Sequence, residues 1–266
     1  MYLNAGTHAS CAQAWLAAAN AIETNGGDAY NLIVDIKQPL ETLPGDDALL
    51  AKVDGFLRGH NGNSLATVAN TIFPLALLQK HGPEKFYSVY HETIWRKMKS
   101  LTRDWGRYFH RLTYWRKPKA NGAKGFDIIN PLADLITFMK TQIASGQTHR
   151  HVYELTVYDP ARDAGKPSNR QCLSFLSFKL TRDNRLLLTA IYRNHHYLSR
   201  ALGNFLGLAR LQAFVADQVG IECGSLTCLA THAEIDHHKS RKDGCVSGWS
   251  KAEARDLLAE IRSLQL

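Results

Sequence analysis

Residues 196–220 form one long, strongly apolar segment, which most constrains how this chain can fold. Its length and composition predict a buried helix. Gly203 and Gly207 lie inside it. Because a glycine in a helix interior costs about 1 kcal/mol, we expect these two positions to let a neighbouring backbone approach closely. Other elements of the chain must therefore pack around this helix.

Strand patterns stand on both sides of this helix in the sequence. Residues 172–179 and 186–192 read as a hairpin across a turn at Asp183-Asn184, and residues 226–236 as a further strand. Other strands are predicted at residues 31–36 and 151–158, and other helices at residues 8–24, 47–57, 64–80, 83–98, 130–145 and 249–264. The whole chain, residues 1–266, is therefore predicted to be a single α+β domain, with a mixed sheet packed by helices around the long buried helix.

Several predicted helices begin at recognisable start signals. Ser64 is a suitable N-cap, and Pro83 stands at the first position of the next helix. Asn130 precedes a proline in the same way, and Ser250 with Glu253 makes a capping box for the final helix. These signals fix where the helices are expected to begin.

The chain is basic, with a formal net charge of +8, which suggests anionic partners such as nucleotides, a polyanion or nucleic acid. Much of this charge lies in residues 96–124, together with aromatic residues that include Trp105 and Trp115. The segment is either a solvated basic face or a surface on which RNA bases stack. For most of its aromatic side chains, a place in the core is the favoured interpretation.

The cysteines point to a reduced, intracellular protein. There are five, Cys11, Cys172, Cys223, Cys228 and Cys245, and their spacing fits neither a disulfide framework nor a CxxC zinc site. The first residues lack the pattern of a signal peptide, and no apolar stretch reaches membrane-spanning length. We therefore expect a cytoplasmic protein with no membrane partner.

Cys172, Arg193 and Asn204 together suit one chemistry. A thiolate can add to C6 of a pyrimidine and make C5 nucleophilic. A guanidinium beside it can bind a phosphate and lower the pKa of the thiol, and an asparagine amide can pair with the N3–H and O4 of a uracil. Structural alternatives remain open: a buried thiol, an arginine in an ion pair, and an amide bonded to the backbone.

A cluster of polar residues follows the last predicted strand. His232, Glu234 and Asp236 would share one face of that strand, and His237 and His238 follow. This pattern could hold a metal ion. A polar strand end that runs into a basic loop is the favoured interpretation, so no metal is expected.

From Cys172 to Asp236 the chain resembles the thymidylate synthase superfamily. Cys172 stands in Gln-Cys-Leu where that family has Pro-Cys-His, and Arg193 opens Arg-Asn-His-His where it has Arg-Ser-x-Asp. Asn204 ends Arg-Ala-Leu-Gly-Asn where the family has Gly-Leu-Pro-Phe-Asn, and His232 matches the histidine of its His-x-Tyr pair. Upstream, Trp95, Tyr108 and the pair Arg150-His151 resemble family segments more loosely, and residues 1–60 do not.

The resemblance implies a set of site residues. It implies catalytic roles for Cys172, Arg193, Asn70 and Tyr108, nucleotide binding by Arg150, His151, Asn194, Asn204, His232 and Glu234, and cofactor binding by Trp95 and His196. It also implies a pyrimidine nucleotide as substrate, 5,10-methylenetetrahydrofolate as the one-carbon donor, and a homodimer built across sheet faces, in which Arg150 and His151 reach the neighbouring subunit's substrate.

Several positions depart from the family pattern. Asn70 stands where the family has its proton-shuttling glutamate, His196 replaces a folate-contacting aspartate, and Glu234 replaces a tyrosine. Two hypotheses therefore remain. One is an enzyme that methylates or hydroxymethylates C5 of a uridylate. The other is a protein that binds nucleotides or RNA and has lost turnover.

Overall fold

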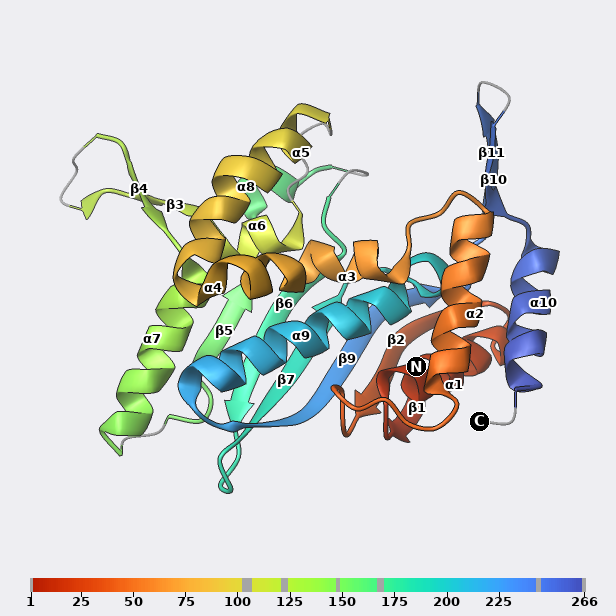
Figure 1. Cartoon of the computed structure of the whole chain (residues 1–266), viewed down its shortest axis with the longest axis horizontal. Coiled ribbons are helices and arrows are strands. Elements are labelled where there is room, and N and C mark those ends of the chain that lie inside the picture. Colours follow the sequence, from red (N-terminus) through yellow and green to blue (C-terminus); the bar gives the residue numbers. More distant parts are fainter. Residues whose placement is uncertain are drawn as a thin grey trace.

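The computed structural model describes residues 2–101, 107–120, 124–146, 149–166, 170–242 and 245–264. Its centre is a mixed sheet with the strand order β1-β2-β9-β7-β6-β5, and the short β8 pairs with β9 (Figure 1). The strands are β1 (Leu3–His8), β2 (Asp28–Ile36), β5 (Tyr153–Thr156), β6 (Leu173–Leu180), β7 (Arg185–Tyr192), β8 (His195–His196) and β9 (Glu222–Glu234). The pairs β1–β2, β7–β9 and β8–β9 are parallel and the others antiparallel. The predicted α+β class is confirmed.

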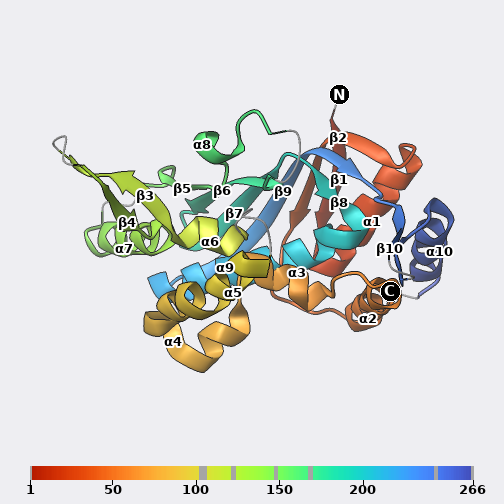
Figure 2. The same cartoon turned by 90° about the horizontal axis from the view of Figure 1, so that it is seen from above.

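Most of the helices pack on one face of this sheet. They are α1 (Cys11–Thr24), α2 (Asp46–Gly59), α3 (Leu65–Ile72), α4 (Leu75–Val89), α5 (Arg96–Leu101), α6 (Tyr108–Thr113), α7 (Pro131–Ala144), α8 (Pro160–Asp163), α9 (Leu202–Val219) and α10 (Lys251–Arg262). Figure 2 shows α9, α3 and α4 on one side and the short α8 on the other. Two hairpins, β3 (Trp115–Pro118) with β4 (Phe126–Ile129) and β10 (His238–Lys242) with β11 (Cys245–Trp249), project from the body. Within the described ranges, no helix is long and apolar enough to cross a membrane.

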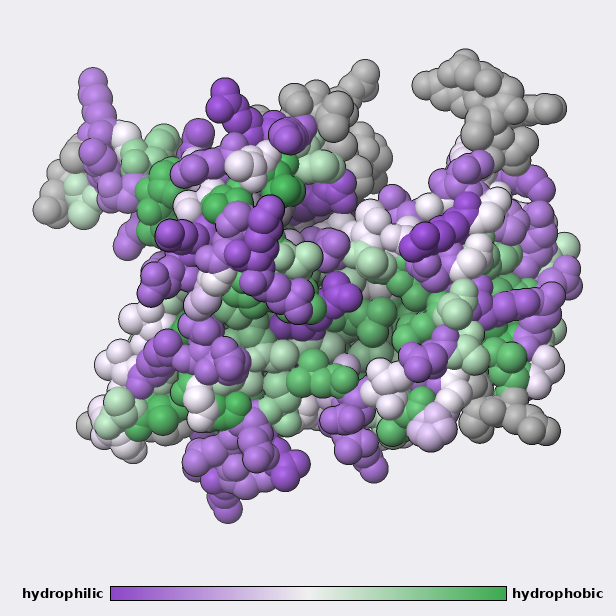
Figure 3. Space-filling view, in the orientation of Figure 1, coloured by the Kyte–Doolittle hydropathy of each residue, from purple (hydrophilic) through white to green (hydrophobic). Residues whose placement is uncertain are grey.

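The long buried helix exists as predicted, although it starts later. Residues Tyr197–Ala201 form a π-helical turn, and α9 follows without a break. Most of α9 is buried, and Gly220 ends it in the left-handed region at φ 81°. In Figure 3, hydrophobic residues gather along the middle of the face where α9 and α3 lie, and hydrophilic residues line its margins.

The two glycines of α9 allow α3 to pack against it at close range, as the sequence predicts. A Cβ atom at Gly203 would lie 2.6 Å from Cβ of Val68, and one at Gly207 would lie 2.8 Å from the carbonyl oxygen of Ala69. Side chains at these positions would therefore push the helices apart. This close crossing brings Val68 and Thr71 of α3 next to Asn204 of α9.

The helix start signals are confirmed, but one predicted helix is divided. The Ser64 side chain accepts from the amide of Thr67 at 3.2 Å, and Ser250 with Glu253 forms the capping box. The helix expected over residues 64–80 stops before Phe73, because Pro74 has no N–H and forces the residue before it into an extended conformation. A further break at Gly82, with φ 71°, restarts the helix at Pro83 as predicted.

The opposite face of the sheet is only partly covered. Leu226, Cys228 and Ala230 of β9 are buried, whereas Leu229 between them is half-buried. Residues Ile33, Phe175, Leu187 and Ile191 of the neighbouring strands are likewise half-buried. Figure 2 shows few elements over this side of the sheet. It is therefore a partly apolar face that, in the described part of the chain, the short α8 covers only in part.

The aromatic residues around the basic segment pack inward. Trp95 is buried and stacks on His110, with ring centroids 3.9 Å apart, and the indole N–H of Trp115 donates to the carbonyl of Arg111. Trp105 lies outside the described residues. Trp95 is thus a core side chain, as that interpretation expects, whereas Trp115 is only half-buried.

Candidate active site

A cavity of about 410 Å³ opens where β6 begins and α9 follows its π-helical turn. Five of the predicted site residues line it: Cys172, Asn204, Asn194, Tyr108 and His196. The other lining residues are Asn63, Val68, Thr71, Arg107, Arg170, Gln171, His195, Ser199 and Arg200. Its volume falls in the range of small-molecule sites.

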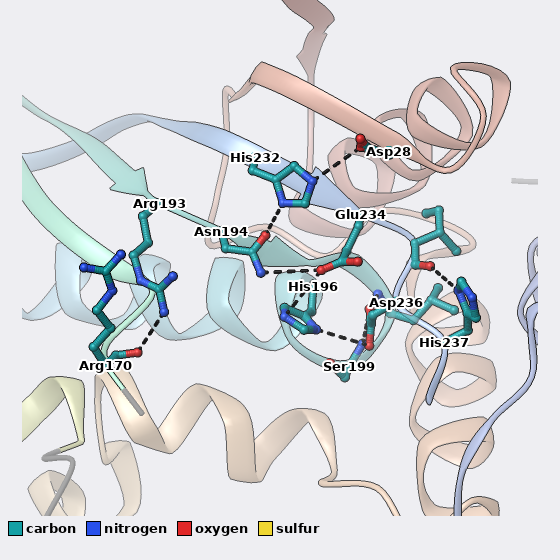
Figure 4. Close-up of polar contacts among 12 residues, drawn as sticks. Asp28, Arg170, Arg193, Asn194, His196, Ser199, His232, Glu234, Asp236 and His237 are labelled. Atoms are coloured by element: carbon teal, nitrogen blue, oxygen red, sulfur yellow. Dashed lines mark hydrogen bonds and ion pairs between the residues drawn. The ribbon is translucent and has the colours of Figure 1, made fainter. Parts of the chain in front are cut away.

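Arg193 holds the segment that carries Cys172, rather than lining the cavity. Its Nε donates to the carbonyl of Gln171 at 2.9 Å, and its Nη2 donates to the carbonyl of Arg170 at 3.1 Å (Figure 4). The amide of Arg193 also donates to the carbonyl of Cys172 at 2.9 Å. The guanidinium expected at a phosphate is thus used on backbone oxygens.

A buried ion pair fixes the same segment further upstream. Arg111 contacts both carboxylate oxygens of Asp163 at 2.6 and 2.9 Å and also donates to the carbonyl of Val157 at 3.1 Å. Burial alone would raise the pKa of Asp163, but the hydrogen bonds from Arg111 and from the amide of Asp159 lower it. The bidentate geometry therefore ties α8 to α6.

The Cys172 thiol is half-buried and makes no disulfide. Burial raises the pKa of this thiol, although Arg193, Arg200 and Arg170 all act to lower it. The sequence-based expectation that a neighbouring guanidinium would acidify the thiol is therefore only partly met, because burial outweighs the three positive charges. The thiol is mostly protonated at neutral pH before a ligand enters.

Tyr108 lies against the same residue. Its hydroxyl hydrogen-bonds with the backbone of Leu173 and Cys172, and burial raises its pKa above the ordinary value. A tyrosine in this state stays protonated and can donate a hydrogen bond. Tyr108 is thus suited to placing a proton donor beside the thiol.

Asn204 is buried at the cavity wall and is held by a histidine. Its amide nitrogen lies 3.0 Å from Nε2 of His195. His195 stacks on Tyr192 with centroids 4.1 Å apart, and burial, with His196 next to it, lowers the pKa of His195 to about 3. The ring is therefore neutral and fixes the plane of the Asn204 amide.

His232 and Glu234 contact Asn194, which lines the cavity, while they themselves do not line it. Nδ1 of His232 lies 2.5 Å from Oδ1 of Asn194, and Nδ2 of Asn194 donates to Glu234 at 3.5 Å (Figure 4). Glu234 also lies 3.6 Å from Nε2 of His196, and Asp28 lies 3.4 Å from His232. This polar chain orients Asn194 and His196 at the mouth of the cavity.

Four of the predicted site residues lie away from the cavity. Asn70 is exposed on α3 and accepts from Arg210 at 3.4 Å, because Leu65, Val68, Ala69 and Ile72 define the buried face of that helix. Trp95 stacks on His110 instead. Arg150 and His151 precede β5. Lys179, near the end of β6, donates to the carbonyl of His151, roughly 25 Å along the strand from Cys172.

Among the lining residues that were not predicted are three arginines: Arg107, Arg170 and Arg200. Two of them stand beside predicted residues, since Arg107 precedes Tyr108 and Arg170 lies two positions before Cys172. Arg200 occupies the glycine position of the family's Gly-Leu-Pro-Phe-Asn segment, which was a usable signal. No Asp or Glu is among the lining residues, and the described part of the chain has no group of three or more His, Cys, Asp or Glu side chains that could hold a metal.

Comparisons with known proteins agree with the motif resemblance. The chain is 28% identical over 116 residues to "Putative thymidylate synthase" of Methanococcoides burtonii, covering 43% of this chain and 52% of that protein. The protein of the same name from Methanosarcina barkeri matches equally, and that from Methanothermobacter thermautotrophicus is 35% identical over 81 residues, 30% of this chain and 36% of its own length. No family model matches. The chain thus spans about half the length of the first of these relatives, and over that part it is similar to proteins named putative thymidylate synthase.

Proposed function

We propose that this chain is an enzyme that transfers a one-carbon unit to C5 of a pyrimidine nucleotide, a uridylate, through addition of Cys172 to C6. The observation that carries the proposal is that Cys172, directly before β6, and Asn204 of α9 line one cavity together with Tyr108. A nucleophile, a base-edge amide and a proton donor are the groups such an addition needs.

The residues divide the work of that reaction. The Cys172 thiol first gives its proton to solvent; as the thiolate sulfur then bonds to C6, the C5–C6 π electrons move toward C5 and O4. The Asn204 amide pairs with the N3–H and O4 edge, and its donor stabilises the charge that develops on O4. His196 lines the cavity and is the group we assign to accept the C5 proton before sulfur is expelled.

The expected folate contacts are only partly met. Of the two residues expected there, His196 lines the cavity, whereas Trp95 is stacked on His110. These residues do not fit a folate stacked on Trp95, so no step is assigned to it. Whether the product carries a methyl or a hydroxymethyl group depends on the folate that donates the one-carbon unit.

A second candidate function is nucleotide binding without turnover. It is favoured by the absence of any Asp or Glu among the cavity-lining residues that the structure describes, because the family's proton shuttle is a glutamate. Under this hypothesis Cys172 is dispensable.

We further propose a homodimer formed through the partly covered face of the sheet. Half-buried apolar residues such as Leu229 and Ile191 lie on that face. Arg150 and His151, remote from the cavity of their own chain, would be available to a neighbouring subunit.

Tritium release from C5-tritiated UMP, dUMP, CMP and dCMP, with and without methylenetetrahydrofolate, tests the enzyme. We expect release from a uridylate that disappears in Cys172→Ala and persists in Cys223→Ala, whose half-buried thiol lies outside the cavity. Equal release from wild type and Cys172→Ala would contradict C6 addition. Nucleotide binding without release would favour the second candidate.

A further inference from the structure

Three arginine side chains line the cavity around the thiol: Arg107, Arg170 and Arg200. None of them forms an ion pair with a carboxylate among the described residues. Other arginines of the chain do, including Arg58, Arg111, Arg185 and Arg262. Because no Asp or Glu of the described chain lines the cavity either, the cavity carries positive charge that the protein does not neutralise there.

The contacts these arginines make are with neutral groups. Nε of Arg170 is buried and has no hydrogen-bond partner in the described chain. Arg200 is met by the Asn63 amide, whose oxygen, when turned toward it, lies 3.1 and 3.3 Å from the two Nη atoms. Nη2 of Arg107 contacts Sδ of Met98 at 3.9 Å. Uncompensated cations in a concave site are costly unless an anion binds.

The position of two of these arginines ties the charge to the proposed chemistry. Arg170 and Arg200 both act on the Cys172 thiol electrostatically, so they lie near the atom that would attack. Arg200 stands one helical turn before Asn204, and residues one turn apart share a helix face. An anion bound there would therefore lie next to the base-reading amide.

We propose that Arg107, Arg170 and Arg200 form an anion-binding site inside the cavity and that it takes a phosphate dianion. The inference rests on the proposed function, because it assigns the phosphate to the same cavity. It replaces the expectation that Arg193 and Arg150 hold this group: Arg193 is bonded to backbone carbonyls, and Arg150 lies outside the cavity. Guanidinium forks match phosphate oxygens in pairs. The phosphate belongs either to the nucleotide itself or to a second ligand that supplies the one-carbon unit.

Titration calorimetry of inorganic phosphate, UMP, dUMP, uridine and deoxyuridine tests the site in wild type, Arg170→Gln and Arg200→Gln. The control is Arg185→Gln, because Arg185 is exposed and paired with Asp183. We expect each cavity variant to weaken phosphate binding by about 10- to 100-fold, the loss of one charge-assisted contact. Arg200→Lys, which keeps the charge without the fork, should weaken it less.

The two sources of the phosphate give different results. If it belongs to the nucleotide, phosphate competes with UMP or dUMP, and Arg200→Gln weakens the nucleotide but not the nucleoside. If it belongs to a second ligand, phosphate binds equally in the presence of saturating nucleotide, and the variant weakens phosphate alone. The proposal is overturned if the folded cavity variants bind phosphate and nucleotide like Arg185→Gln, or if wild type binds neither.

Failure of this site and failure of the proposed enzyme are separable. Phosphate binding that depends on the cavity arginines must survive in Cys172→Ala, because the thiol is not a phosphate ligand. Arginine-dependent binding without tritium release would leave the anion site standing and remove the enzyme. Tritium release that depends on Cys172, with phosphate binding that does not depend on the arginines, would leave the enzyme standing and remove the anion site.

Discussion

The crossing of α3 and α9 makes a sharp prediction about Gly207. Replacing Gly207 with alanine would place Cβ 2.8 Å from the carbonyl oxygen of Ala69 and 3.0 Å from Cβ of Ile72. Two of the three nearest atoms belong to backbone, which cannot rotate away. Overpacking of this kind costs typically 1–3 kcal/mol, against a gain of about 1 kcal/mol for alanine over glycine in a helix.

We therefore expect Gly207→Ala to lower the free energy of unfolding by up to about 2 kcal/mol. A matched control exists in α2, where Gly55 is exposed in a helix and a Cβ would meet nothing within 4 Å. Gly55→Ala should raise the free energy of unfolding by about 0.5–1 kcal/mol, because only the helix propensity changes. The two substitutions are chemically identical and should differ in sign.

Urea unfolding followed by circular dichroism measures both variants, with the midpoint read at unchanged slope. Gly203→Ala extends the test, since its Cβ would lie 2.6 Å from that of Val68. Combining Gly203→Ala with Val68→Ala should recover only a small part of the loss, because it removes Cγ1 of Val68, at 2.8 Å, but keeps the Cβ of residue 68, at 2.6 Å. If Gly207→Ala stabilised the protein as much as Gly55→Ala, the close helix crossing would be refuted.

Three further predictions concern the ion pair, the thiol and the sheet face. Asp163→Asn should destabilise the fold by about 3–5 kcal/mol, because it leaves the buried Arg111 charge unpaired. The pKa of Asp163 is lowered in the folded state. Its contribution to stability is therefore complete above its unfolded-state pKa of about 3.9 and is lost as the pH falls through its folded-state pKa. The difference in unfolding free energy between Asp163→Asn and wild type should thus shrink as the pH is lowered. Alkylation of Cys172 by iodoacetamide should be slow at pH 7 and faster at higher pH, because burial raises the pKa of this thiol. Bound nucleotide should block the alkylation. Cys223, whose pKa is raised to about 11, is the control and should not be protected by nucleotide. Leu229→Arg should convert a dimer to a monomer in light scattering, and an unchanged mass would exclude this face as the interface.

The elements were predictable where local chemistry decides them. The caps at Ser64 and Ser250, the hairpin that follows Cys172 and the glycine-containing buried helix all follow from residue types and spacing. The assignment of Asn70 followed motif position alone, and the structure places this residue on the exposed side of α3. The spacing of Leu65, Val68 and Ile72 already defines the buried face of that helix, and Asn70 does not lie on it.

The direction of long side chains was not predictable in the same way. Arg193 stands at the expected place in the chain, but a guanidinium on a flexible stem can reach either the cavity or the carbonyls of Arg170 and Gln171. Those backbone acceptors leave no trace in the sequence. The π-helical turn at Tyr197–Ala201 carries Ser199 and Arg200, which line the cavity, and the residue pattern does not distinguish such a turn from an ordinary helix start.

The sequence assigned two tasks to Arg193, binding a phosphate and lowering the pKa of the Cys172 thiol. The geometry of its side chain separates them. Its hydrogen-bond partners are neutral carbonyl oxygens, so its charge is not cancelled when an anion enters the cavity. Among the arginines that lower the pKa of the thiol, it has the largest effect, although burial outweighs all of them. Arg170 and Arg200, in contrast, would lose much of their effect on the thiol once paired with phosphate. Arg193 is therefore the charge that still favours the thiolate in the ligand-bound state.

Arg193→Gln should accordingly shift the pH midpoint of Cys172 alkylation upward and leave phosphate affinity within about twofold of wild type. Arg193→Lys, which keeps the charge and loses the fork, should shift that midpoint less. Arg200→Gln should give the opposite pattern. It should weaken phosphate binding, and in the presence of saturating phosphate it should change the pH midpoint of Cys172 alkylation little. If Arg193→Gln lowered phosphate affinity as strongly as Arg200→Gln does, then Arg193 would itself be a phosphate ligand, and its hold on the Cys172 loop would have to be released when the ligand binds.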